Sequence, residues 1–138
     1  MIPSVDCTAS DFALIEMTKQ VARRLHVSGI HEVASSVETS AGDTYSGIHM
    51  NASVGFADVC GEVAAICAMV GSGHRDLATI VAVWSNGQEK YSLFAPCGRC
   101  RELISDLNPE ARVIVGTLDA PYVMSIAELL PLKGRDRQ

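Results

Sequence analysis

Two apolar runs, residues 77–85 (LATIVAVWS) and 112–117 (RVIVGT), constrain the fold of this chain more than any other feature. Both are rich in β-branched residues, and neither alternates strictly between polar and apolar positions. A strand that is exposed on one face alternates in this way, whereas a strand that is covered on both faces does not. The runs therefore predict two strands of a sheet that lies buried between helices.

The rest of the chain supplies helices for such a sheet. Apolar residues three or four apart predict an amphipathic helix with Ser10 as its N-cap, and three further segments have helical patterns. The four expected helices span residues 10–27, 58–70, 97–107 and 125–131. Residues 31–50 predict a β-hairpin around a turn at 41–43.

This order of helices and strands predicts an α/β protein, a three-layer α/β/α sandwich around a mixed sheet. A chain of 138 residues has the usual size of one compact domain, so residues 1–138 are expected to form a single domain. Hydrophobic residues make up 48% and charged residues 20% of the chain, which is a globular balance rather than that of a disordered protein.

Charge and hydropathy exclude several classes of function. The formal net charge is -5 at pH 7, so the chain offers no obvious basic face to nucleic acid. No apolar run approaches the roughly 20 residues that span a bilayer, and the first residues, MIPSVDCTASDF, lack the features of a signal peptide. We therefore expect a cytoplasmic protein that binds neither nucleic acid nor membranes and takes a small-molecule substrate.

The five cysteines are the first candidates for chemistry. Cys97 and Cys100 have the C-x-x-C spacing, which by itself fits a redox dithiol, half of a structural zinc site or chance. Cys60 adds a third thiol at the start of another helix. Three thiolates with a fourth position open favour a catalytic Zn²⁺ site, because structural sites usually fill all four positions. Cys67 is expected to be a small core residue, and Cys7 a bystander near the terminus.

Glu62 stands two positions after Cys60. An acid in this position can lie beside the metal without binding it and carry the proton of a metal-bound water. The alternative is that Glu62 only stabilises the first turn of its helix through the helix dipole, which would be preferred without the cysteine cluster.

The segments CGE (residues 60–62) and PCGRC (residues 96–100) together resemble the signature of the zinc-dependent cytidine deaminases. That signature is (His or Cys)-x-Glu followed by Pro-Cys-x-x-Cys. The similarity extends over almost the whole chain, and Val63 and Arg99 resemble the blasticidin S deaminase branch in particular. The resemblance implies a cytidine deaminase-like fold with a five-stranded mixed sheet, and a homotetramer with active sites near the subunit interfaces.

The resemblance also implies a mechanism. The three cysteines bind Zn²⁺, Glu62 takes the proton of a zinc-bound water, and the hydroxide attacks the ring carbon that bears the exocyclic amine. Glu62 then protonates the ring nitrogen and the leaving amino group, which departs as ammonia. Gly61, where the family usually has Ala, contacts the base through its backbone. Arg99 is expected to hydrogen-bond a zinc thiolate and offset its charge; the alternative is a solvent-exposed helix arginine.

Several positions depart from the cytidine deaminase pattern. The family's Asn-x-Glu, which clasps the ribose 3′-hydroxyl, aligns with His49 and Asn51, and an aromatic residue of the base pocket aligns with His31. An imidazole and an amide bind a hydroxyl more weakly than a carboxylate does. The tail, residues 132–135, also lacks the terminal aromatic residue of the family. We expect an altered substrate pocket, formed by His31, His49, Asn51 and Gly61.

We therefore expect a zinc-dependent hydrolase that releases ammonia from a cytosine-type nucleoside, either cytidine, deoxycytidine or a modified analogue. The alternative substrate is a blasticidin S-type nucleoside antibiotic or another aminated heterocycle. A non-enzymatic zinc module gives no reason for Glu62 or for an open coordination position. A polynucleotide-editing deaminase would need a basic or aromatic-rich extension, and a thiol redox protein would form a reversible Cys97–Cys100 disulfide.

Overall fold

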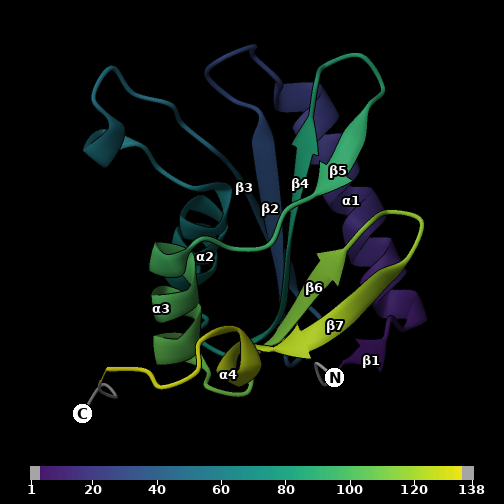
Figure 1. Ribbon diagram of the computed structural model, residues 1–138, viewed down its shortest axis with the longest axis vertical. Helices are drawn as coiled ribbons and strands as arrows, with labels where there is room; N and C mark the ends of the chain where they lie inside the picture. The colour runs from purple at the N-terminus through teal and green to yellow at the C-terminus, as the bar shows by residue number, and fades with distance from the viewer. Residues whose placement is uncertain (1–3, 135–138) are drawn as a thin grey trace.

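The computed structural model describes residues 4–134 (Figure 1). The helices in this range are α1 (Ala9–Leu25), α2 (Gly61–Gly71), α3 (Gly98–Leu107) and α4 (Ile126–Leu129), together with the 3₁₀ turn η1 (Gly55–Ala57). The strands are β1 (Val5–Asp6), β2 (Val33–Thr39), β3 (Thr44–Ile48), β4 (Leu77–Ser85), β5 (Tyr91–Leu93), β6 (Arg112–Gly116) and β7 (Pro121–Ser125).

These strands form one mixed sheet in the order β1-β7-β6-β4-β2-β3, and β5 pairs with β4 beside this path. The two apolar runs, β4 and β6, are parallel neighbours, whereas the other strand pairs are antiparallel. A parallel pair requires a long crossover connection, and here it runs through β5 and α3.

Helices cover both faces of the sheet, with α1 on one face and α2 and α3 on the other (Figure 1). Consecutive residues of β4 contact opposite layers, because Val81 packs in the cluster that contains α1 residues and Ile80 packs with residues of α2 and α3. Ile114 and Val113 of β6 divide in the same way. The predicted α/β class, with strands buried on both faces of a three-layer sandwich, is confirmed.

The sheet has seven strands within the described residues, where the resemblance implied five. The strands β1, β5 and β7 were not assigned from the sequence. β1 and β5 have two and three residues, which is too short to show a periodic pattern. β7 begins with Pro121, and proline, which lacks a backbone N–H, is disfavoured inside a strand but tolerated as its first residue. β7 pairs with β6, where Pro121 lies opposite Gly116 next to the connecting turn.

The N-cap of α1 is Thr8, and the prediction of Ser10 was wrong. Thr8 and Asp11 form a reciprocal capping box, in which each side chain accepts a hydrogen bond from the backbone N–H of the other. The Ser10 hydroxyl instead donates to the carboxylate of Glu38. The capping box therefore starts the helix earlier than the apolar periodicity indicated.

The catalytic-motif helix α2 begins at Gly61 rather than at Asp58. The preceding residues are extended, because Val59 forms a β-bridge with Met50 and Cys60 is an N-cap with extended backbone angles. As a result, Cys60 lies at the N-terminal end of the helix and not on its side.

A glycine in β3 allows α2 to lie close to the sheet. A Cβ atom at Gly47 would overlap the backbone nitrogen of Ala65 and the Cβ atom of Ala64. Only glycine permits so close an approach of a strand to a helix backbone. This contact fixes the position of α2, whose first turn carries Glu62.

None of the helices found between residues 4 and 134 combines the length and the apolar character that crossing a membrane requires. Arg135, the last residue of the tail considered above, lies outside the described residues.

Candidate metal centre and active site

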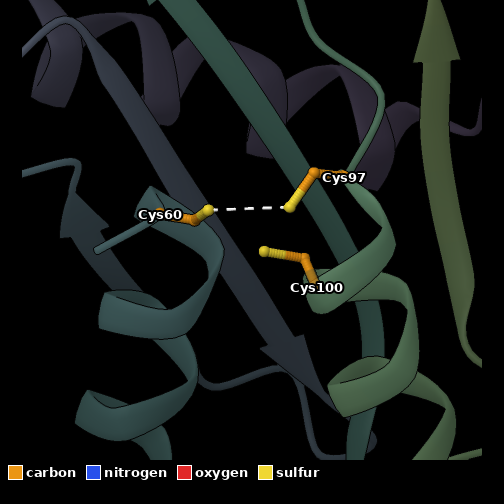
Figure 2. A group of neighbouring side chains, drawn as sticks. All are labelled: Cys60, Cys97 and Cys100. Atoms are coloured by element: carbon orange, nitrogen blue, oxygen red, sulfur yellow. Dashed lines mark hydrogen bonds between the residues drawn. The ribbon is translucent and has the colours of Figure 1, made fainter. Parts of the chain in front are cut away.

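Three cysteine thiols meet where the N-terminal ends of α2 and α3 lie next to each other (Figure 2). Cys60 is the N-cap of α2, Cys97 is the N-cap of α3, and Cys100 lies in the first turn of α3. Their three Sγ atoms lie within 4.8 Å of one another. Figure 2 shows the three thiols directed towards a common centre.

The dimensions of this cluster fit a tetrahedral thiolate site. Zn–S bonds of about 2.3 Å in a tetrahedron place the sulfur atoms roughly 3.8 Å apart. The Sγ atoms of Cys60 and Cys97 are 3.7 Å apart, close to this value. The three residues are therefore able to hold a metal ion, and they leave one tetrahedral position for a further ligand.

The thiols of the cluster differ in their ionisation. Burial acts to raise the pKa of Cys97, but hydrogen bonds from the backbone N–H of Cys100 and from the Cys60 thiol outweigh it, so this pKa lies below its ordinary value. The pKa of Cys100 is strongly raised, because the thiol is buried and lies near the carboxylate of Glu62. Three thiolates so close together repel one another, and a bound cation removes this repulsion.

Arg99 extends from α3 towards the start of α2. Its Nη2 atom donates hydrogen bonds to Sγ of Cys60 at 3.3 Å and to the carbonyl oxygen of Asp58 at 3.0 Å. The hydrogen bond to Cys60 and the negative charge of the thiolates raise the pKa of the guanidinium above its usual range. Arg99 is thus a permanent positive charge in contact with the cluster.

Glu62 lies in the first turn of α2 with 6% of its surface exposed. Its Oε2 atom accepts a hydrogen bond from the thiol of Cys100 at 3.3 Å. Within residues 4–134, no lysine, arginine or histidine forms an ion pair with this carboxylate. A buried acid beside a metal centre is suited to take and return a proton.

A cavity of about 130 Å³ opens beside the cluster. It is lined by Val33, His49, Cys60, Gly61, Glu62, Phe94, Ala95 and Cys97. The cavity thus joins two cluster thiols and the buried acid to a largely apolar wall. Phe94 is held in this wall by stacking on Trp84, with ring centroids 6.4 Å apart.

Three residues of the wall were not predicted from the sequence. Phe94 and Ala95 directly precede the PCGRC segment, so their distance from the motif could have indicated them. Val33 had no such signal, because it reaches the cavity only through the position of β2 in the sheet.

The structure separates the four residues expected to contact the substrate. His49 and Gly61 line the cavity, and His31 and Asn51 do not. Nδ1 of His31 lies 2.8 Å from the carbonyl oxygen of His49. The side-chain amide of Asn51 donates to the carbonyl oxygen of Gly29. His31 and Asn51 therefore hold the backbone around the cavity.

The two remaining cysteines lie outside the cluster. Cys67 is exposed, so the prediction of a core residue was wrong. The apolar residues of α2 surround the helix, and their spacing does not show which side faces the sheet. Cys7 is partly buried beside α1, and its burial and the nearby Asp11 carboxylate raise the pKa of its thiol.

Solved structures of cytidine deaminases have the same fold. The cytidine deaminase from Burkholderia pseudomallei matches with a TM-score of 0.74 and 26% identity, over 91% of this chain and 98% of that chain. The cytidine deaminase from Bacillus anthracis matches with a TM-score of 0.75 and 16% identity, over 88% of this chain and 86% of that chain.

A curated relative decides the family. The chain is 35% identical to blasticidin-S deaminase from Bacillus cereus over 127 residues, which cover 89% of this chain and 91% of that protein. The chain belongs to the cytidine deaminase-like family. No protein-family model matches the sequence. The resemblance drawn from the CGE and PCGRC segments is confirmed, and the classification as a hydrolytic deaminase with it.

In this cytidine deaminase-like chain the two motif segments form the first turns of neighbouring helices. The arrangement gathers three thiols, a buried acid and an open cavity at one point of the fold. The guanidinium of Arg101 donates hydrogen bonds to the carbonyl oxygens of Pro96 and Leu129, both at 2.8 Å. These bonds connect the segment before Cys97 to α4.

Proposed function

We propose that this protein is a zinc-dependent hydrolytic deaminase that releases ammonia from a cytosine-type nucleoside. The observation that carries the proposal is the position of Glu62, a buried carboxyl that lines one cavity together with the thiols of Cys60 and Cys97. A metal site that only stabilised the fold would require neither an acid nor access to a cavity. The arrangement therefore supports an enzyme over a zinc-stabilised binding module.

The cysteines, Glu62 and Arg99 have different roles in the proposed reaction. The three cysteines would hold the Zn²⁺ ion, which when bound supplies the Lewis acidity that makes water a nucleophile at neutral pH. Glu62 takes a proton from the attacking water and passes it to the ring nitrogen, and it then carries the second proton, from the newly added hydroxyl, to the departing amino group. Arg99 holds its positive charge against Cys60 and so offsets the negative charge of the thiolates.

The cavity suits the base of a small substrate. Val33, Phe94 and Ala95 give it apolar surface against which the face of a heteroaromatic ring can pack. Gly61 lines the cavity without a side chain, so the backbone at the start of α2 is accessible to the edge of that ring. The net charge of -5 disfavours a polynucleotide as the substrate.

A nucleoside antibiotic of the blasticidin S type is the second candidate substrate. The 35% identity to blasticidin-S deaminase over 89% of the chain favours it. Both candidates place an aminated ring beside Glu62, and they differ in the part of the substrate that lies beyond the ring.

We also propose that the chain forms a homotetramer of single-domain subunits in the cytoplasm. Exposed apolar side chains on the loop before Cys60 support a subunit contact: Phe56 is 90% exposed and Met50 54% exposed. Sedimentation of the purified protein is expected to give a mass of four chains. Phe56→Asp should lower this mass, and a monomeric wild-type protein would contradict the proposal.

The function is tested by ammonia release from the zinc-loaded protein. Substrates are cytosine, cytidine, deoxycytidine, 5-substituted cytidines, blasticidin S and aminopurines. A cytosine-type compound is expected to react, and Glu62→Gln should retain zinc and fold while losing about 10²- to 10⁴-fold in rate. If none of these compounds reacts, the proposed function is wrong; if Glu62→Gln retains full activity, the assigned role of Glu62 is wrong.

A further inference from the structure

Asp58 closes the loop that leads from β3 to the metal centre. Its Oδ1 atom accepts a hydrogen bond from the backbone N–H of Ala52 at 2.6 Å. Next to this contact, Val59 and Met50 exchange two backbone hydrogen bonds of 2.9 Å in a β-bridge. These contacts bring together the two ends of the loop, residues 51–58, directly before Cys60.

The 51–58 loop has little support from the core. It extends away from the sheet (Figure 1), and residues 53–57 are all exposed, with Phe56 at 90%. The hydrogen bonds of residues 53–57 form the single turn η1. A segment with so few buried apolar side chains opens at a low cost in free energy. The hydrogen bonds at its ends therefore decide how firmly it stays closed.

The backbone of Asp58 contacts the metal centre through Arg99. Nη2 of Arg99 donates both to the carbonyl oxygen of Asp58 at 3.0 Å and to Sγ of Cys60 at 3.3 Å. The ψ angles of Asp58 and Cys60, 144° and 149°, are those of an extended chain. One nitrogen reaches both acceptors because residues 58–60 follow this extended course. Closure of the loop and the Arg99 contact thus depend on the same three residues.

The side chain of Asp58 contributes an acceptor oxygen rather than a charge. Within residues 4–134, the thiol cluster consists of the three cysteines and does not include Asp58. Arg99 bonds the carbonyl oxygen of Asp58, and no ion pair joins it to the carboxylate in the same part of the chain. Any effect of this side chain on a metal therefore passes through the backbone that it holds.

We propose that Asp58 is a positioning residue for Cys60 and Arg99, and that it acts by closing the 51–58 loop. This inference rests on the proposed zinc site. A loop that becomes ordered only when a ligand binds subtracts its ordering cost from the affinity, whereas a loop that is already closed does not. The carboxylate of Asp58 consequently makes the thiol cluster a tighter zinc site without contacting the metal.

The test compares Asp58→Ala with Asp58→Asn. Both variants remove the same charge, but only Asn keeps an oxygen that can accept from the N–H of Ala52. Asp58→Ala is expected to bind zinc about three- to thirtyfold more weakly in chelator competition, somewhat less than the loss typical for a direct partner of a metal ligand. Its Ala52 amide should exchange hydrogen about tenfold faster. Asp58→Asn should stay within about threefold of the wild type in both measurements.

Asp76→Ala is the matched control. The carboxylate of Asp76 also accepts a hydrogen bond from a backbone N–H, that of Ser40, at 3.2 Å. Asp76 directly precedes Leu77, which pairs with Thr39 at the end of β2 opposite to Val33 and the cavity. Whatever its effect on the melting temperature, Asp76→Ala should bind zinc as tightly as the wild type.

A double variant shows whether Asp58 acts on the segment that Arg99 holds. If both residues keep residues 58–60 in place, their contributions are coupled. The loss of zinc affinity in Asp58→Ala/Arg99→Ala should then be smaller than the product of the two single losses. Losses that multiply independently would show that Asp58 does not act through this segment, and would overturn the proposal.

The inference and the proposed function fail differently. If the wild type binds one zinc and releases ammonia but Asp58→Ala has the zinc affinity of the wild type, only this inference is wrong. A loss of more than tenfold in Asp58→Asn also overturns it, and this measurement still decides if Asp58→Ala does not fold. A wild type that binds zinc but deaminates nothing contradicts the proposed function alone. A wild type without stoichiometric zinc contradicts both.

Discussion

Nη2 of Arg99 lies 3.3 Å from Sγ of Cys60, so a hydrogen bond joins the start of α3 to the start of α2 across the thiol cluster. Removal of a group that hydrogen-bonds a metal ligand typically costs about 10- to 100-fold in metal affinity or activity. Arg99→Ala is therefore expected to fold but to lose this factor in zinc affinity or kcat, measured by chelator competition and by ammonia release.

Arg99→Lys is the matched variant for this prediction. It keeps the positive charge but lacks the forked geometry that reaches both Cys60 and the carbonyl oxygen of Asp58, so it should be intermediate. Zinc affinity and turnover in Arg99→Ala equal to those of the wild type would show that the contact has no functional role.

Cys60→Ser and Cys67→Ser change two cysteines of the same segment, of which only Cys60 belongs to the cluster. Cys60→Ser should lose stoichiometric zinc, and its melting temperature should no longer respond to a chelator. Cys67→Ser should retain one zinc per chain. Metal analysis after dialysis decides between them, and equal zinc contents would contradict the assigned ligands.

Gly61→Ala introduces the residue that is usual in the family at this position. In this chain the added Cβ would lie 2.8 Å from the carbonyl oxygen of Val33, so either β2 or the start of α2 must shift. We expect a loss of about 1–3 kcal/mol in unfolding free energy, together with lower kcat/KM. Urea unfolding measures the first quantity and the ammonia assay the second.

Gly71→Ala provides the control at the other end of α2. Nothing lies within 4 Å of a Cβ atom there, so the change should leave stability equal or raise it by up to about 1 kcal/mol. If Gly61→Ala is as stable and active as Gly71→Ala, the backbone of β2 can shift without a loss of unfolding free energy, and the prediction is wrong.

Asp11 and Arg112 form an ion pair. Its removal is expected to make the free energy of unfolding less dependent on pH in the acidic range. The Asp11 carboxylate is 2% exposed and accepts two hydrogen bonds from Arg112, at 2.8 and 2.6 Å. Burial acts to raise the pKa of Asp11, but the hydrogen bonds from Arg112 and Thr8 hold it below the ordinary value of 3.8.

The sign follows from the lowered pKa. A carboxyl with a lower pKa in the folded state stabilises the fold above its unfolded pKa, and the stabilisation disappears as the pH falls through the folded value. At neutral pH the free energy of unfolding of Asp11→Asn should be about 1.5–3 kcal/mol lower than that of the wild type. Urea unfolding at about pH 3 should give a smaller difference between the two proteins. A deficit that is the same at both pH values would contradict this assignment.

The reaction centre could be predicted because its chemistry is encoded locally. Cys60 and Glu62 stand within one helical turn, as do Cys97 and Cys100. The nearness of the two turns depends on the sheet, yet the ligand spacing was sufficient to infer it.

The substrate wall could not be predicted to the same extent. His31, His49 and Asn51 are close in space, but an ungapped alignment does not show which side chain faces the cavity and which holds backbone. The N-cap of α1 was predicted wrongly for a local reason, because the capping box of Thr8 and Asp11 starts the helix before its apolar periodicity begins.

The close approach at Gly47 has a consequence for how this sequence can vary. One of the atoms that a side chain would meet there is the backbone nitrogen of Ala65, which every replacement at position 65 other than proline retains as an N–H. The backbone carbon of Ala64 is a second such atom, so a loss caused by Gly47→Ala has no simple suppressor in α2, although replacing Ala64 with glycine removes the contact with its Cβ atom. In a saturation library, a position without any functional group should tolerate as few substitutions as the cysteines themselves.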